Sequence, residues 1–163
     1  MLFRSVLGRR AYLDRGLAAA PEDAGVLAAF GELSLDKKEW TKAEGYFRRA
    51  RAADPRNADA ALGLGKALYR QAKYADSEAA YGEAVALEPK LPFAYADRAR
   101  ARYQLGKYEE AMADLDAAAA RAPDSSWIYL DRGRMNLDLE RRDRAEADLT
   151  RVSGDLLFLA NAH

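Results

Sequence analysis

The chain has 163 residues, of which 50% are hydrophobic and 32% are charged, and its 26 basic and 26 acidic residues give a formal net charge of zero. This length suffices for one domain with a buried core, and the balanced charge argues against nucleic-acid binding, which usually goes with a basic excess. The absence of cysteine excludes disulfides, thiolate zinc sites, iron–sulfur clusters and cysteine nucleophiles, and the single histidine is the last residue, His163.

The N-terminal stretch MLFRSVLGRR is expected to be an ordinary amphipathic helix. Arg4 interrupts its apolar residues, which argues against a secretory signal peptide, while its arginines leave a transit peptide as an alternative. No stretch of the sequence approaches the roughly 18 apolar residues that a membrane span needs. We therefore expect a cytoplasmic location by default, with a signal sequence removed from this chain as the open alternative.

Proline recurs along the chain at a fixed interval of 34 residues, at Pro21, Pro55, Pro89 and Pro123. Two further columns keep the same interval. The small column is Gly31, Gly65, Ala99 and Gly133, and the large column is Phe47, Tyr81, Leu115 and Leu149. A fixed interval of this size is typical of repeat proteins.

Within each period the apolar residues recur at steps of three and four, which predicts α-helix. In the second period one stripe is Ala61, Leu64 and Leu68, and the next is Tyr74, Ser77, Tyr81 and Ala84. The polar stretch RQAK separates the two stripes, so each period is predicted to be two short antiparallel helices. Pro89 then ends one pair, and Pro92 begins the next one in the first helical turn, where proline is tolerated.

The predicted elements follow in chain order. They are a lone helix in 1–23, helix pairs in 24–57, 58–91, 92–125 and 126–153, and a C-terminal segment in 154–163. Gly154 is predicted to end the fourth pair, and Asp155 to begin a new helix. The apolar run 156–159 cannot all lie on one helical face, so it needs a cover. We expect this last segment to cap the fourth pair, because a cap needs no second molecule. Association with a second copy and the start of a further repeat are the alternatives.

Glycine in the small column has a predicted packing role. A glycine inside a helix costs about 1 kcal/mol relative to alanine. Its repetition at Gly31, Gly65 and Gly133 therefore suggests that the two helices of a pair cross closely at this position. The residues of the large column are then expected to fill the space between neighbouring repeats.

The pattern resembles the tetratricopeptide repeat (TPR), which reads W-x2-L-G-x2-Y, then A-x3-F, then A and P over 34 residues. The second period carries most of it, in Leu64, Gly65, Leu68, Ser77, Tyr81, Ala84 and Pro89. Arg98 and Arg132 stand where the family has leucine. The resemblance covers essentially the whole chain and implies an all-α fold, a right-handed superhelical solenoid of antiparallel helix pairs with a concave groove.

By this resemblance we expect a non-catalytic protein–protein interaction module that binds a peptide or protein segment in the groove. The alternative is a structural or self-assembling scaffold that associates through its terminal helices as a homo-oligomer. No catalytic, cofactor-binding or metal-binding residues stand out. The stretch GLGKA lacks the rest of a phosphate-binding loop, and Asp114 and Asp116 are expected to be solvated surface charges. We therefore expect no enzymatic activity and no cofactor.

In TPR proteins the first helix of each repeat lines the groove, and the register transfers that role to eight residues of this chain. They are Lys66, Tyr69, Arg70, Phe93, Arg100, Tyr103, Trp127 and Arg134. A basic row beside aromatic side chains would suit an acidic, partly apolar segment. In the alternative, Asp97 and Asp131 pair with these arginines, within a helix or across repeats, and the aromatic rings are buried.

One subtype of the family is excluded by its motif. TPR co-chaperones that bind the C-terminal carboxylate of heat-shock proteins use lysine, asparagine and arginine at fixed positions of three repeats. Those positions hold Ala28, Glu32, Gly63, Phe93 and Asp97, or, one repeat later, Leu62, Lys66, Asp97, Trp127 and Asp131. Neither set forms the clamp, so we do not expect a partner of that kind.

Overall fold

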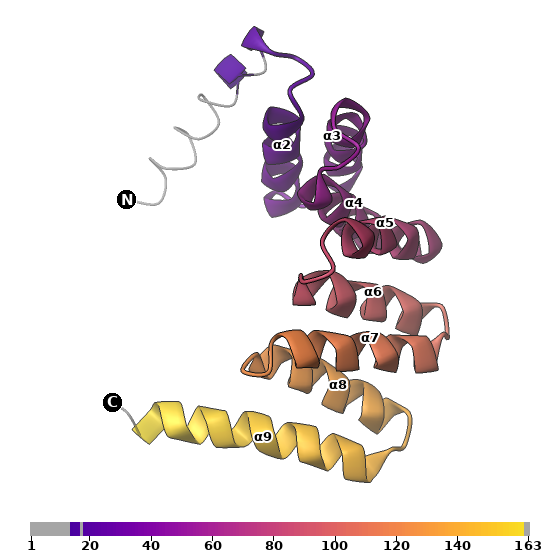
Figure 1. Ribbon diagram of the computed structural model, residues 1–163, viewed down its shortest axis with the longest axis vertical. Helices are drawn as coiled ribbons and strands as arrows, with labels where there is room; N and C mark the ends of the chain where they lie inside the picture. The colour runs from indigo at the N-terminus through magenta and orange to yellow at the C-terminus, as the bar shows by residue number, and fades with distance from the viewer. Residues whose placement is uncertain (1–13, 17, 162–163) are drawn as a thin grey trace. The chain divides into compact units, whose positions relative to one another are not determined.

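The computed structural model describes residues 14–16 and 18–161, with side chains described up to residue 153 (Figure 1). All regular secondary structure in these residues is α-helical, which confirms the predicted fold class. The lone helix predicted in 1–23 falls largely outside them. None of the helices in the described ranges combines the length and the apolar character that crossing a membrane requires.

The chain divides into two compact units, residues 1–89 and 90–163. Helices of the first unit are α2 (Ala24–Asp36), α3 (Trp40–Ala53), α4 (Ala58–Arg70) and α5 (Tyr74–Leu87). Helices of the second unit are α6 (Pro92–Gln104), α7 (Tyr108–Arg121), α8 (Ser126–Asp138) and α9 (Arg142–Asn161). They pack as consecutive pairs, α2 with α3, α4 with α5, α6 with α7 and α8 with α9.

Local sequence explains where the first helix of each pair begins. The side chains of Asp23 and Asn57 accept hydrogen bonds from the backbone N–H groups three residues on, which caps α2 and α4 at 2.8 Å. Pro92 is the first residue of α6, as predicted, because its missing N–H has no partner in the first helical turn.

The turn inside each pair places one residue in the left-handed region, at φ between 58° and 74°. These residues are Lys38, Ala72, Gly106 and Glu140. The next N–H then donates to the carbonyl five residues back, as from Lys73 to Leu68 at 3.0 Å and from Lys107 to Arg102 at 2.9 Å. This bond closes the C-terminus of the first helix and reverses the chain.

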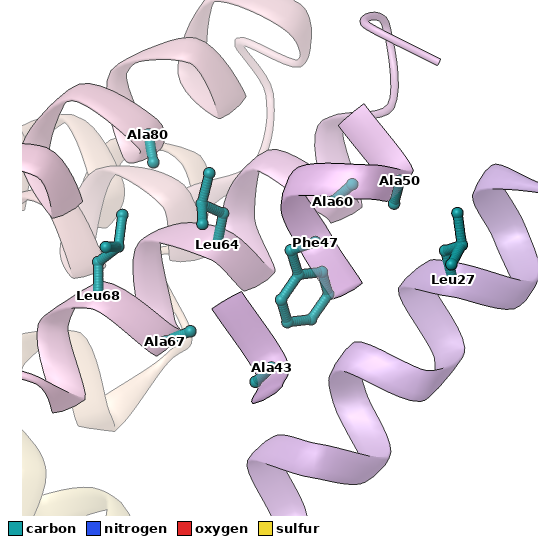
Figure 2. Close-up of a cluster of buried hydrophobic side chains, with 9 residues drawn as sticks. All are labelled: Leu27, Ala43, Phe47, Ala50, Ala60, Leu64, Ala67, Leu68 and Ala80. Atoms are coloured by element: carbon teal, nitrogen blue, oxygen red, sulfur yellow. The ribbon is translucent and has the colours of Figure 1, made fainter. Parts of the chain in front are cut away.

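The small and large columns pack directly against each other. In the first unit the Phe47 ring lies between α2 and α4, within 2.6 Å of where a Cβ on Gly31 would be and 2.3 Å of one on Gly63 (Figure 2). In the next pair the Tyr81 ring lies in the equivalent position, 2.5 Å from where a Cβ on Gly65 would be. A large side chain of a second helix therefore lies against each of these glycines and leaves no room for a Cβ.

The second unit uses smaller side chains in the same register. Leu149 lies 3.0 Å from where a Cβ on Gly133 would be. In the preceding repeat Ala99 and Leu115 occupy the two columns, and both are fully buried. Leucine in the large column thus goes with alanine in one repeat and with glycine in the next.

Two sequence expectations are wrong in the second unit. Gly154 does not end the fourth pair, because α9 continues through it to Asn161, so the predicted break and new helix at Asp155 do not occur (Figure 1). Asp114 is not a solvated surface charge. It is 4% exposed, and its carboxylate accepts hydrogen bonds from Arg98 Nε at 2.8 Å and Arg102 Nη1 at 2.9 Å.

Candidate protein-binding surface

The eight residues expected to bind a partner lie on α4, α6 and α8, each of which is the first helix of its pair. Lys66, Tyr69 and Arg70 lie on α4 in the first unit. The other five lie in the second unit, with Phe93, Arg100 and Tyr103 on α6 and Trp127 and Arg134 on α8. The second unit therefore carries most of the candidate site.

An aromatic pair joins α6 to α8. The rings of Phe93 and Trp127 stack with their centroids 5.5 Å apart and 4° between their planes. Phe93 remains 51% exposed, which is high for a large apolar side chain. Leu130 is 39% exposed and follows Trp127 by three residues on α8, so it lies on the same helix face. We refer to Phe93, Trp127 and Leu130 as the aromatic platform.

Arg100 supports the platform from one side. Its guanidinium carbon lies 5.6 Å from the centroid of the Trp127 ring. It donates from Nη1 to Asp97 Oδ1 at 2.7 Å and from Nε to Asp131 Oδ2 at 2.8 Å. The pairing with acidic residues that the sequence left open therefore occurs at Arg100, and two carboxylates offset its charge.

Arg134 differs from Arg100 although both hold the same register position. Its side chain is exposed, and it makes no hydrogen bond or ion pair with any residue that the structure describes. It follows Trp127 by seven residues, two helical turns along the same face of α8. In the second unit Arg134 is thus the arginine of the predicted basic row that is available to an anion.

Tyr103 connects the far ends of α6 and α8. Its hydroxyl donates to Asp138 Oδ2 at 3.0 Å, and its ring contacts Tyr108 with centroids 5.2 Å apart. Burial, together with this hydrogen bond to a carboxylate, raises the pKa of the Tyr103 phenol. The hydrogen bond from Tyr103 to Asp138 thus joins α6 to α8.

In the first unit the three candidate residues of α4 have a different environment. The guanidinium carbon of Arg70 lies 5.8 Å from the centroid of the Trp40 ring on α3. The ring of Tyr69 meets that of Tyr74 at a centroid distance of 5.4 Å and an angle of 63°. Lys66 is half-buried. These contacts make α4 a packing helix of its unit, with Arg70 exposed at its end.

Sequence reasoning missed one residue of the platform and found no chemistry for a cofactor. Leu130 lies on the first helix of its repeat, which the family resemblance already assigns to the groove, so the signal was present. No group of three or more histidine, cysteine, aspartate or glutamate side chains within the described ranges could hold a metal ion.

Two sequence profiles, each described as tetratricopeptide repeat, match residues 29–94 and 92–135. The chain belongs to the tetratricopeptide-repeat family. Members of this family are generally non-catalytic protein–protein interaction modules. A search of curated protein sequences finds no match to the chain.

Solved structures show the same fold. MamA from Desulfovibrio magneticus RS-1 has a TM-score of 0.81 at 19% identity, over 88% of this chain and 81% of that one. PilF from Pseudomonas aeruginosa has a TM-score of 0.83 at 19% identity, over 94% and 70%. The first TPR of Spaghetti (RPAP3), bound to the HSP90 peptide SRMEEVD, has a TM-score of 0.70 at 26% identity, over 73% and 94%. The fold is an all-α TPR superhelical array.

Proposed function

We propose that the protein is a non-catalytic interaction module that binds a peptide or protein segment on the face of α6 and α8 in its second unit. The observation that carries this proposal is the stacked pair of Phe93 and Trp127. Two large rings held in a fixed geometry, one of them half exposed, offer wide apolar contact at little cost in conformational entropy. Exposed aromatic side chains of this kind are the usual energetic centre of a protein interface.

The platform and Arg134 together define the ligand. Trp127 and Arg134 are seven residues apart on one helix, about 10 Å along its axis. An extended segment covers that distance in about three residues. We infer a ligand with an apolar side chain on the platform and an aspartate or glutamate about three residues away, against the guanidinium of Arg134.

Arg100 has a supporting role in this proposal. Its donors are directed to Asp97 and Asp131, and its cation lies beside the Trp127 ring. Replacing it would loosen the platform and leave two carboxylates without their partner. Arg100 is therefore a positioning residue, and Arg134 is the residue that contacts an acidic group.

The likeness to the Spaghetti repeat supports peptide binding, since that protein is bound to the HSP90 peptide SRMEEVD. We propose that this chain binds a different segment. Glu32 and Asp97 stand at two positions of the carboxylate clamp, where they would repel the carboxylates of such a peptide. SRMEEVD is accordingly a probe that we expect to bind weakly or not at all.

The experiment uses a Trp40→Phe protein, in which Trp127 is the only tryptophan and its fluorescence reports the platform. Peptides with leucine or phenylalanine at one position and glutamate at varied spacing are titrated into it. We expect the tightest binding at a spacing of about three residues, a loss of about tenfold for Phe93→Ala, and about fivefold for Arg134→Glu with acidic peptides alone.

Arg144→Glu is the matched control, because it reverses an exposed arginine on α9 outside this face. Helical circular dichroism confirms that each variant is folded. Equal peptide binding by the wild type and a folded Phe93→Ala/Trp127→Ala variant, measured by calorimetry, would remove the α6–α8 face from the proposal. SRMEEVD binding as tightly as the best peptide would refute the proposed ligand.

A further inference from the structure

A second open surface lies on the last helix pair of the second unit. Here α8 and α9 form a pocket of about 670 Å³. Its lining residues are Leu137, Arg142, Glu146, Leu149, Thr150 and Ser153. Leu137 is 49% exposed, and Leu149, in the large column, is only partly buried.

The same surface of the first repeat is covered. Three periods earlier, the positions of this pocket hold Leu35, Trp40, Glu44, Phe47, Arg48 and Arg51. There α4 packs on α3, with its Gly63 against the Phe47 ring, and Phe47 is fully buried. The Trp40 carbonyl accepts a hydrogen bond from Gln71 Nε2 at 3.4 Å. A helix with small residues therefore fits this type of surface.

One charged residue makes the comparison specific. The carboxylate of Glu44 accepts hydrogen bonds from Lys73 Nζ at 2.9 Å and from Gln71 Nε2 at 2.8 Å, both in the turn that follows α4. Glu146 holds the same register position on α9. It is exposed and has no hydrogen bond or ion pair with the residues that the structure describes. The α8–α9 pocket thus has the Glu146 carboxylate at the position where, in the first unit, the Glu44 carboxylate binds the side chains of Lys73 and Gln71.

We propose that the α8–α9 pocket docks a helix of a partner protein in the way that α3 docks α4. The chemistry of the partner follows from that geometry. Its helix has alanine or glycine at steps of three and four toward Leu149 and Leu137, and a lysine or arginine just past its C-terminus, against Glu146.

A second copy of this chain fits the pocket poorly. In a second copy, the helix equivalent to α4 and nearest the N-terminus is α2. The face of α2 that would enter the pocket carries Val26. This side chain already contacts Gly16, since its Cγ2 lies 3.2 Å from where a Cβ on Gly16 would be. The turn after α2 has Glu39 where the turn after α4 has Lys73. Docked in that way, Glu39 would face Glu146, and like charges repel.

The chain itself provides a probe for this pocket. A synthetic peptide of residues 57–74, NADAALGLGKALYRQAKY, carries α4 with Gln71 and Lys73. Its binding to the full chain is measured by anisotropy of a labelled peptide. We expect saturable binding that Leu137→Glu abolishes and that Glu146→Lys weakens about fivefold. A Lys73→Glu peptide should bind the Glu146→Lys protein about as tightly as the original pair.

Glu110→Lys is the matched control, because it makes the same charge change at an exposed position of α7 away from the pocket. Failure of the peptide to bind at about 1 mM, or binding that neither Leu137→Glu nor Glu146→Lys alters in folded protein, would overturn the proposal. Sedimentation of the chain alone tests whether a second copy of the chain occupies the pocket. A dimer that Leu137→Glu dissociates would assign the pocket to a second copy and refute a partner helix.

Discussion

Arg132 and Asp148 form a bidentate ion pair inside the last helix pair, with Nε to Oδ2 at 2.9 Å and Nη2 to Oδ1 at 2.6 Å. Asp148 is 5% exposed. The two residues preceding them by two periods are Leu64 and Ala80, which belong to the apolar core of the first unit. One register pair is therefore apolar in one repeat and ionic in another, and the helices pack in the same way around both.

Replacing one partner should cost far more stability than replacing both. We expect Asp148→Ala to lower the free energy of unfolding by about 2–3 kcal/mol, because it leaves a half-buried guanidinium without its main partner. Arg132→Leu/Asp148→Ala, which copies Leu64 and Ala80, should recover most of the loss, because no buried charge remains. Urea denaturation of the two variants and the wild type measures both values.

Arg144→Leu serves as the control for removing an exposed arginine from the same helix pair, and it should change stability by less than about 0.5 kcal/mol. A double variant as unstable as Asp148→Ala alone would show that the ion pair is required for this packing and would contradict the apolar equivalence.

Gly65 and Tyr81 should be coupled in stability. A Cβ on Gly65 would lie 2.5 Å from the Tyr81 ring, so Gly65→Ala should destabilise the first unit by about 1–3 kcal/mol. Gly65→Ala/Tyr81→Leu reproduces the combination of Ala99 and Leu115. We expect the double variant to lose less free energy of unfolding than the sum of the losses from Gly65→Ala and Tyr81→Leu. Double-mutant cycles from thermal or urea unfolding give the coupling energy.

Gly45 is the internal control for that substitution. It lies in the middle of α3, it is exposed, and apart from its chain neighbours and the surrounding backbone of its own helix, no described atom lies within 4 Å of where its Cβ would be. Gly45→Ala should therefore stabilise the protein by about 1 kcal/mol through helix propensity alone. If Gly45→Ala were as harmful as Gly65→Ala, the contact with the large column would not explain the glycine.

The turns predict opposite effects of one exchange at two equivalent positions. Ala72 has φ 58° and Gly106 has φ 74°, both in the left-handed region that disfavours a side chain. Ala72→Gly should stabilise the protein by up to about 1 kcal/mol, whereas Gly106→Ala should destabilise it by about the same amount. A shift of the same sign for both variants in urea denaturation would contradict this explanation of the turns.

Glu44 should contribute a pH-dependent part of the stability. Burial raises the pKa of the Glu44 carboxyl, but hydrogen bonds from Lys73, Gln71 and Arg48 outweigh it and lower the pKa from 4.5 to about 2. Because the folded pKa lies below the unfolded one, the stabilisation is complete above pH 4.5 and is lost as the pH falls toward 2. The free energy of unfolding of the wild type should exceed that of Glu44→Gln by roughly 2 kcal/mol at pH 6, and this difference should shrink steadily below pH 4.5.

Urea unfolding of both proteins at several pH values between 6 and 3 measures this difference. Glu88→Gln, which removes an exposed carboxylate at the end of α5, is the control and should follow the wild type across the range. A gap between wild type and Glu44→Gln that does not change with pH would mean that the Glu44 charge is not what stabilises the contact.

The sequence by itself determined the helices and their pairing. The helical steps of three and four and the turn residues located the helices, because these signals act over a few residues. Their recurrence every 34 residues then grouped the helices into the pairs that the structure describes. It also placed Phe93 and Trp127 at the same position of successive repeats, and Arg100 and Arg134 likewise. Equal register is a consequence of the repeat and needs no knowledge of contacts.

Tertiary structure decided what each of those positions does. Asp114 reads as a surface charge from its own helix, and its burial depends on Arg98 and Arg102, which reach it from α6. Arg100 and Arg134 are indistinguishable by register, yet Arg100 alone is held by two carboxylates, because long side chains find partners across helices at no fixed spacing in sequence.

The end of α9 shows the same division. Gly154 predicted a helix end, since glycine commonly adopts the left-handed conformation there. A glycine inside a helix costs only about 1 kcal/mol, and neighbouring turns and packing readily compensate for that. Local sequence therefore fixed where helices are possible, whereas the choice between ending and continuing one depended on small energy differences that only the folded chain resolves.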